Sequence, residues 1–330
     1  MASLPLTLAC APYDRALPLF DGRVRAAGIA LNVILLRPED TFWRMFRHQE
    51  FDASEMSLSS YLISKEHGPD FVAIPIFLSR MFRHSSIYVN SAAGVRKPED
   101  LKGGRIGVPE YQMTAALWIR GILQHEYGVA PHEVSWFSGG LDEPGRIEKL
   151  PLNLPSNVSL QPIAAHQTLN QMLEEGELDA LVTARPPSSF QEPGGSVKRL
   201  FEDYKSVEIA YYKKTKIFPP MHCVAIRKEI YEKNRWIARS LYEAFVEARQ
   251  YCTLDNLFFG HLGVTLPFLH HAVEETAKVF GDEDPWAYGI DGNLNTLNTL
   301  IHYSHEQGLI PRRYTIEELF APELLDVPRN

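Results

Sequence analysis

The amino-acid sequence predicts an α/β protein with two lobes, each a mostly parallel sheet flanked by helices, and a ligand cleft between them. Strand and helix patterns alternate twice along the 330 residues, which is typical of parallel sheets. The second block begins at Gly103-Gly104, and the chain returns through Phe218-Pro219-Pro220 to a mainly helical tail. We therefore expect lobe 1 to comprise residues 1–104 and 218–330, with the C-terminal helices, and lobe 2 to comprise residues 105–217.

The first block joins short apolar runs of strand length to amphipathic runs of helix length. The segment 17–27 is expected to form a helix, with Leu17, Phe20 and Val24 among its apolar residues. The predicted helices are 17–27, 39–48 and 58–67, and the predicted strands are 6–11, 31–36, 51–56, 71–78 and 86–89.

The second block repeats the alternation, and its clearest helix runs over residues 114–127. Thr114 is expected to cap this helix, and Gly128 to end it. A loop rich in proline and glycine follows over residues 142–155. The other predicted strands are 105–109, 134–137, 178–183 and 223–226, and the other predicted helices are 166–175, 238–251 and 294–306.

Composition and charge exclude several classes of protein. The net charge is −8 and there is no run of Lys or Arg, which argues against nucleic acid as a partner. No stretch approaches the roughly 18 apolar residues of a membrane span. The three cysteines, Cys10, Cys223 and Cys252, are far apart and form no CxxC, so neither a disulfide framework nor a thiolate zinc site is predicted. The segment 4–10 fits a first strand better than a lipoprotein signal, and we expect a cytoplasmic protein.

A dense group of cations lies between two apolar runs of this acidic chain. Arg80, Arg83 and His84 fall within five residues at a predicted strand end. Guanidinium groups bind carboxylates through two hydrogen bonds, and imidazole exchanges a proton near neutral pH. The segment therefore predicts a site for a small anion with an acid–base group beside it; the alternative is a solvated basic loop.

Other polar residues lie where predicted strands end, and ligands of open α/β sheets bind at the carboxyl ends of strands. Glu55 is an acid–base candidate, and it could equally be a carboxylate at the entry of the next helix. Thr114 lies at a helix N-terminus, which attracts anions, or it only caps that helix. Arg185 precedes two prolines and is a candidate carboxylate clamp, with a surface ion pair as the alternative. The same rule selects Tyr13 and Glu110.

The histidines outside this group are less informative. His222 follows Phe218-Pro219-Pro220-Met221 at the expected return between lobes, where a structural role and a role in the cleft are both open. His302 and His305 share one helical face, near Glu306 and Glu274. They have no third ligand at a fixed spacing, so no metal site is predicted.

Several stretches together resemble the 4,5-dihydroxyphthalate decarboxylase family. They are Phe51-Asp52-Ala53-Ser54-Glu55-Met56-Ser57, Ser79-Arg80-Met81-Phe82-Arg83-His84, Gly107-Val108-Pro109-Glu110-Tyr111-Gln112, Trp118-Ile119-Arg120-Gly121 and Asp284-Pro285-Trp286-Ala287-Tyr288-Gly289. Ala287 stands where a proline is expected. The resemblance covers nearly the whole chain and implies a type II periplasmic binding protein-like fold used by a cytoplasmic enzyme.

This resemblance implies decarboxylation of a hydroxylated aromatic dicarboxylate, most directly 4,5-dihydroxyphthalate to protocatechuate and CO2, with no organic cofactor and with metal dependence left open. Loss of CO2 from an aromatic ring becomes accessible once the ring carbon is protonated, which requires a general acid and cations for the carboxylates. In this scheme Arg80, Arg83 and Arg185 hold the carboxylates. His84 is the acid, and Glu55 or His222 sets the phenolic proton. Tyr13, Glu110 and Tyr288 are expected to line the ring and its hydroxyls, and Thr114 is a further candidate for binding the substrate.

The main alternative is a non-catalytic solute-binding protein for an aromatic or small dicarboxylate, which needs the same cleft and arginines but no acid–base group. Another enzyme on the same fold, such as chorismate dehydratase or a hydroxypyrimidine-forming thiamin enzyme, is a third reading. The expected partner is a small aromatic carboxylate, with neither nucleic acid nor membrane, and the helical tail is consistent with a homo-oligomer.

Overall fold

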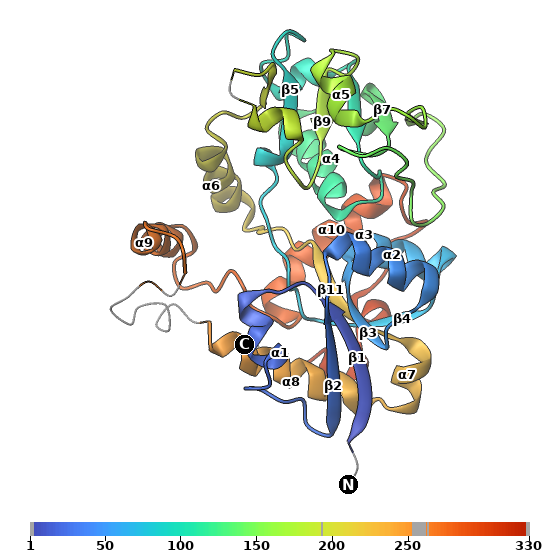
Figure 1. The fold of residues 1–330 in the computed structure, drawn as a ribbon, viewed down its shortest axis with the longest axis vertical. Coiled ribbons are helices and arrows are strands. Elements are labelled where there is room, and N and C mark those ends of the chain that lie inside the picture. The colour runs from blue at the N-terminus through green and yellow to red at the C-terminus, as the bar shows by residue number, and fades with distance from the viewer. Residues whose placement is uncertain (1–2, 193, 253–261, 263, 328–330) are drawn as a thin grey trace.

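The computed structural model describes residues 3–192, 194–252, 262 and 264–327, and it has two sheets (Figure 1). The first sheet has the order β2-β1-β3-β11-β4 and consists of β1 (Leu4–Cys10), β2 (Ile29–Leu35), β3 (Ala53–Ser57), β4 (Phe71–Ile74) and β11 (His222–Arg227). The second has the order β10-β5-β9-β6-β7-β8 and consists of β5 (Ile87–Asn90), β6 (Arg105–Val108), β7 (Ser135–Ser138), β8 (Ser159–Pro162), β9 (Ala180–Val182) and β10 (Val197–Arg199). The predicted α/β class with two sheets is confirmed.

One strand in each sheet runs against its neighbours. In the first sheet β11 is antiparallel to β3 and β4, and in the second β5 is antiparallel to β9 and β10. Each follows a passage of the chain from one sheet to the other. The strand expected at 86–89 therefore pairs in the second sheet, and the chain leaves the first sheet before β5, earlier than the expected boundary at residue 104.

Two segments connect the sheets side by side. The Met221 amide donates to the Ser79 carbonyl at 2.7 Å, and the Met81 amide to the Pro219 carbonyl at 3.1 Å. The two connections thus form a short antiparallel pair between the lobes. Since Arg83, Met221 and His222 lie at the ends of this pair, the connection itself delivers side chains to the space between the sheets.

Helices cover the sheets and join them at the back. Around the first sheet lie α1 (Leu17–Phe20), α2 (Pro38–His48), α3 (Leu58–His67), α7 (Lys228–Lys233), α8 (Trp236–Gln250) and α11 (Ile316–Leu319), and around the second lie α4 (Thr114–Tyr127), α5 (Leu169–Glu174) and α6 (Tyr204–Thr215). Helix α10 (Leu294–Glu306) packs on both α3 and α4, whereas α9 (Leu269–Phe280) lies at the side and contacts α6 (Figure 1). One hydrophobic cluster therefore runs from α2 and α3 through α10 to the second sheet.

The ends of the helices agree with the sequence prediction where residues near those ends, such as Gly68 after α3, indicate them. The helices predicted at 58–67 and 294–306 match α3 and α10 at both ends. The helix predicted at 17–27 is wrong beyond residue 20, because the chain turns at Gly22 with a φ of +84° that favours glycine. Thr114 is the first residue of α4, and Met113 holds the cap position.

Gly121 makes the contact between α4 and α10 possible. A Cβ atom placed there would lie 2.1 Å from Cδ2 of Tyr303, which is buried on α10. Gly121→Ala is therefore expected to lower the free energy of unfolding, since overpacking typically costs about 1–3 kcal/mol and outweighs the gain of about 1 kcal/mol in helix propensity. Denaturant unfolding would measure the change, with Gln124→Ala on the same helix as the control. A more stable Gly121→Ala protein would contradict this packing.

Candidate active site

A cavity of about 480 Å³ lies between the two sheets. Its wall combines residues of both lobes, and three helices begin at it. The residues preceding α2, α3 and α4 are Arg37, Ser57 and Met113, and all three line the cavity. Helix N-termini carry partial positive charge and favour anions. The complete lining is Arg37, Pro38, Glu39, Phe42, Ser57, Arg83, Met113, Thr114, Ala115, Arg146, Lys149, Ala184, Arg185, Met221 and His222.

The charged groups of this wall are mostly positive. One lining carboxylate, Glu39, faces five lining cations: Arg37, Arg83, Arg146, Lys149 and Arg185. A protein of net charge −8 thus places five cations around one cleft. Cations that converge in a partly closed space attract anions and hold carboxylates by charge-assisted hydrogen bonds. The cavity suits a small molecule with more than one negative charge.

Glu55 and His222 form a pair because of how β3 and β11 are aligned. Glu55 is opposite Val224 in this antiparallel ladder, and His222 is opposite Ser57. Side chains alternate along a strand, so Glu55 and His222 are diagonal neighbours on one face. His222 Nδ1 lies 2.6 Å from Glu55 Oε1. The imidazole lines the cavity, while Glu55 is fully buried behind it.

Several donors keep the buried Glu55 carboxylate charged. Tyr13 donates its hydroxyl to Oε1, and the Ala11 amide donates to Oε2 at 3.0 Å. Burial raises the pKa of Glu55, but His222, Tyr13 and the Ala11 amide together bring the pKa below its ordinary value. Because Nδ1 of His222 is bound to Glu55, Nε2 is the nitrogen left to exchange a proton with a molecule in the cavity.

The ionised state of Glu55 can be tested through the pH dependence of stability. A pKa lowered on folding adds stability above the ordinary carboxyl value of 4.5, and that contribution is lost as the pH falls through the folded value. Glutamine mimics the protonated acid, so Glu55→Gln should destabilise the protein more at pH 7 than at pH 4. Urea unfolding of both proteins at each pH measures this, and an equal destabilisation at the two pH values would refute it.

Arg83 is a buried cation that forms no ion pair with a described carboxylate, although the buried Glu208 lies near enough to attract it. It is 5 % exposed and lines the cavity. Its Nε contacts Met221 Sδ at 3.2 Å and its Nη1 contacts Ser86 Oγ at 3.4 Å, and none of the described carboxylates forms an ion pair with it. Burial lowers its pKa to about 10, so it is still charged at neutral pH. A buried charge of this kind gains most from an anion that enters the cavity.

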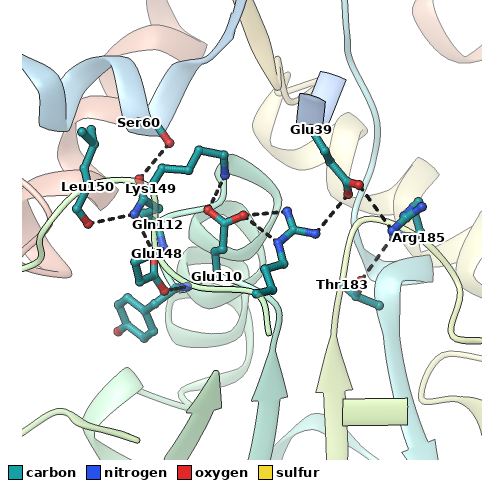
Figure 2. A network of polar contacts seen from close by, with 11 residues as sticks. Glu39, Ser60, Glu110, Gln112, Glu148, Lys149, Leu150, Thr183 and Arg185 are labelled. Carbon is teal, nitrogen blue, oxygen red and sulfur yellow. Dashed lines mark hydrogen bonds and ion pairs between the residues drawn. The ribbon is translucent and has the colours of Figure 1, made fainter. Parts of the chain in front are cut away.

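The loop between β7 and β8 brings two cations, Arg146 and Lys149, to the wall. Figure 2 shows Lys149 pointing toward Glu110. Buried Glu110 accepts from Arg146 Nε at 2.7 Å and from Lys149 Nζ. Gln112 fixes the same loop by donating to Glu148 Oε2 at 2.7 Å and to the Leu150 carbonyl at 3.1 Å. Glu110 therefore does not line the cavity but anchors the cations that do.

The structure brings together some of the residues predicted from sequence and separates others. Arg83, Thr114, Arg185 and His222 line the cavity, and Glu55 and Tyr13 lie directly behind His222. Thr114 Oγ1 lies 2.9 Å from Ser57 Oγ, which joins the starts of α3 and α4.

His84 lies away from the cavity despite following Arg83. It is 1 % exposed, and its ring packs against Tyr127, Phe201 and Tyr211. Burial lowers its pKa to about 4, so at pH 7 the imidazole is neutral and is not in the protonated form that a general acid needs. Neither ring nitrogen has a hydrogen-bond partner among the described residues. The acid role expected of His84 thus has no support in this geometry.

Arg80 and Tyr288 are also outside the cavity wall. Arg80 donates to the Phe218 carbonyl at 3.1 Å, to the Ala287 carbonyl at 3.1 Å and to the side chain of Asn293. It therefore ties the connection between the lobes to the C-terminal segment. Tyr288 is fully buried in the core on one face of the first sheet. Neither residue is placed to hold a ligand in this cavity.

Sequence reasoning missed several residues of the wall. Glu39 was predicted only as the first residue of a helix, and Arg146 and Lys149 only as part of the loop 142–155. Arg37 and Phe42 were not predicted as site residues. Phe42 packs edge-on against His222 with ring centroids 4.8 Å apart. The available signal was the pair of cations in a loop rich in breakers, since long loops that fold back often serve a site.

A cluster of two histidines and one glutamate lies between α4 and α10, outside the cavity lining. His125 of α4 joins His302 and Glu306 of α10, with their ligand atoms within 4.8 Å of one another, whereas His305 is not in the group. Arg313 contacts His302 Nδ1, and a metal-bound imidazole normally needs that nitrogen as a donor. The cluster is therefore described as an ion-pair network between α4 and α10.

Comparison with known proteins identifies the family. The chain is 38 % identical over 327 residues to a 4,5-dihydroxyphthalate decarboxylase of Comamonas testosteroni, covering 99 % of each sequence. The chain belongs to the 4,5-dihydroxyphthalate decarboxylase family. A second member of the family, from Pseudomonas putida, is 41 % identical over 214 residues, which cover 64 % of this chain and 83 % of that protein. No family model matches the chain.

Solved structures place this member of the family among periplasmic binding protein-like folds. The periplasmic aliphatic sulphonate binding protein of Escherichia coli aligns with a TM-score of 0.54 at 13 % identity, covering 98 % of this chain and 99 % of that one. A DSZB mutant in complex with biphenyl-2-sulfinic acid aligns with a TM-score of 0.51 at 17 % identity, covering 98 % and 97 %. The predicted fold is confirmed. No helix in the described part of the chain is both long and apolar enough to span a bilayer.

Proposed function

We propose that this chain decarboxylates 4,5-dihydroxyphthalate, giving protocatechuate and CO2. The observation that carries the proposal is the Glu55–His222 pair at the wall of a cavity with five cations. A site that only bound a dicarboxylate would need the cations, but not an imidazole oriented by a buried carboxylate. The family's decarboxylase names support the same reaction.

The retained carboxylate binds at the inner end of the cavity in this proposal. Arg83 supplies there a buried guanidinium that forms no ion pair with a described carboxylate, and the starts of α3 and α4 add partial positive charge. Arg146, Lys149 and Arg185 face the second carboxylate from the other lobe. The ring then lies between the two groups of cations, within reach of His222.

Proton transfer from His222 starts the chemistry. The proton on Nε2 moves to the ring carbon that carries the departing carboxylate, and a C–H bond forms. The hydroxyl para to that carbon donates electron density and stabilises the positive charge on the ring. The bond to the carboxylate then breaks, its electron pair restores the aromatic ring, and CO2 leaves. Glu55 fixes the orientation of His222 and stabilises the positive charge of its protonated form.

We also propose that the enzyme works in the cytoplasm, as the sequence predicted. Cys10 and Cys223 are free and fully buried, and free thiols are usual in a reducing compartment. A homo-oligomer remains part of the proposal, since the helical tail is consistent with self-association.

The direct test is turnover of 4,5-dihydroxyphthalate by the purified protein, with and without a chelator, followed by CO2 release and protocatechuate formation. We expect turnover in both conditions. Saturable binding without turnover would instead favour a solute-binding protein for this class of acid. Turnover that requires an added divalent ion would show that the described side chains are not the whole catalytic apparatus.

A further inference from the structure

Glu39 is the lining carboxylate of an otherwise cationic wall, and it spans the cleft. It is the second residue of α2, beside the first sheet, and it lines both the main cavity and an adjoining opening of about 470 Å³. Its carboxylate faces two loops of the other lobe (Figure 2). One loop connects β7 to β8 and carries Arg146, and the other follows β9 and carries Arg185.

Each oxygen of Glu39 binds one guanidinium. Oε1 lies 3.3 Å from Arg146 Nη1, and Oε2 lies 3.3 Å from Arg185 Nη2. Arg146 uses its Nε and Nη2 on Glu110, so Nη1 is the nitrogen that it offers to the cleft. For Arg185, Glu39 is the ionic partner among the described residues.

These contacts are weak enough to be exchanged. They are longer than the 2.6 Å between Arg146 and Glu110, and the side chains of Glu39 and Arg185 are 36 % and 54 % exposed. Exposed ion pairs contribute little net free energy, because solvent screens them. A carboxylate of an incoming ligand could replace Glu39 on the same two guanidiniums while Arg146 stays anchored on Glu110.

We infer that Glu39 is an intramolecular competitor for Arg146 and Arg185, and that a dicarboxylate substrate displaces it on binding. The inference rests on the proposed function, whose substrate carries two adjacent carboxylates. A dicarboxylate held at Arg83 places its second carboxylate toward the two outer guanidiniums and must displace Glu39. A monocarboxylate held at Arg83 leaves the Glu39 contacts intact. Glu39 therefore weakens the binding of a dicarboxylate but not that of a monocarboxylate. It also neutralises Arg146 and Arg185 in the absence of substrate, which reduces their attraction for other anions.

Calorimetric titration of the full chain with phthalate and with benzoate tests this. Glu39→Gln should bind phthalate about three- to tenfold more tightly than wild type, as expected when two exposed ion pairs no longer compete. Its affinity for benzoate should change by less than about twofold. Asp40→Asn is the matched control, because it removes the same charge from the next residue of α2. Asp40 is exposed and forms no ion pair with the described residues.

The outcomes separate this inference from the proposed function. The inference is overturned if Glu39→Gln binds phthalate no more tightly than Asp40→Asn does. It is also overturned if Glu39→Gln binds phthalate more weakly than wild type, because Glu39 would then stabilise the binding-competent arrangement of the two lobes. Equal gains for phthalate and benzoate would also overturn it, since they would reflect net charge alone. Because calorimetry needs no turnover, an inactive wild-type protein would refute the decarboxylase while leaving this result valid.

Discussion

His222→Asn is expected to lower kcat for 4,5-dihydroxyphthalate by about 10²–10⁴-fold, the usual contribution of a general acid. Asparagine places an amide nitrogen close to the position of Nδ1, so it can still donate to Glu55, which lies 2.6 Å from Nδ1 in the native protein. It carries no proton that it can deliver at neutral pH. The loss should therefore fall on the chemical step. Steady-state turnover and phthalate calorimetry on the same preparation measure the two effects separately.

The prediction assigns the acid role to His222 and not to His84, and each assignment can be tested. Turnover of His222→Asn near the wild-type value would remove His222 from the acid role. A loss of phthalate binding as large as the loss of turnover would show that His222 acts in binding instead. A His84 variant that still folds should keep most of its activity, because that imidazole is neutral and enclosed by aromatic rings.

Arg83→Met should weaken phthalate binding by about 2–5 kcal/mol, the usual effect of removing one partner of a buried charge pair, which is roughly 30-fold or more. Methionine keeps much of the buried aliphatic volume but removes the charge. The same change should leave the free protein equally stable or more stable, because the attraction of the nearby Glu208 offsets only part of the cost of burying the Arg83 charge.

Weaker phthalate binding together with unchanged or higher stability distinguishes the loss of a binding residue from a general loss of folded structure. Calorimetry with phthalate gives the first quantity and urea unfolding gives the second. Arg37→Met is a suitable comparison, because Arg37 also lines the cavity but is exposed. Unchanged phthalate affinity in Arg83→Met would mean that the carboxylates bind elsewhere in the cleft.

The most accurate sequence predictions were those that depend only on neighbouring residues, namely helix ends and the residues at strand ends. Helix α3 is followed by Gly68 and α10 is regularly amphipathic, and both ends of each were predicted. The rule that ligands lie at strand ends selected Glu55, Thr114 and Arg185, because a strand end can be recognised from the residues around it. All three lie at or directly behind the cavity wall.

What could not be predicted depends on contacts between distant segments. Glu55 and His222 are 167 residues apart and meet only through the antiparallel register of β3 and β11. The segment that contains Arg83 and His84 was recognised, but which of two adjacent side chains turns toward the cleft is decided by packing. Arg146 reaches the wall because it binds buried Glu110, and no local pattern in a loop predicts such an anchor.

The position of β11 between β3 and β4 bears on the order in which the chain can fold as it is synthesised. The strands of the second sheet all lie between residues 87 and 199, so that sheet can be completed while the ribosome is still adding later residues. The first sheet lacks an inner strand until residues 222–227 emerge. The N-terminal strands, although made first, are therefore expected to reach their final pairing after the rest of the site's scaffold exists. Until then β3 and β4 have open edges, which makes this stretch of synthesis the one most exposed to wrong strand pairing.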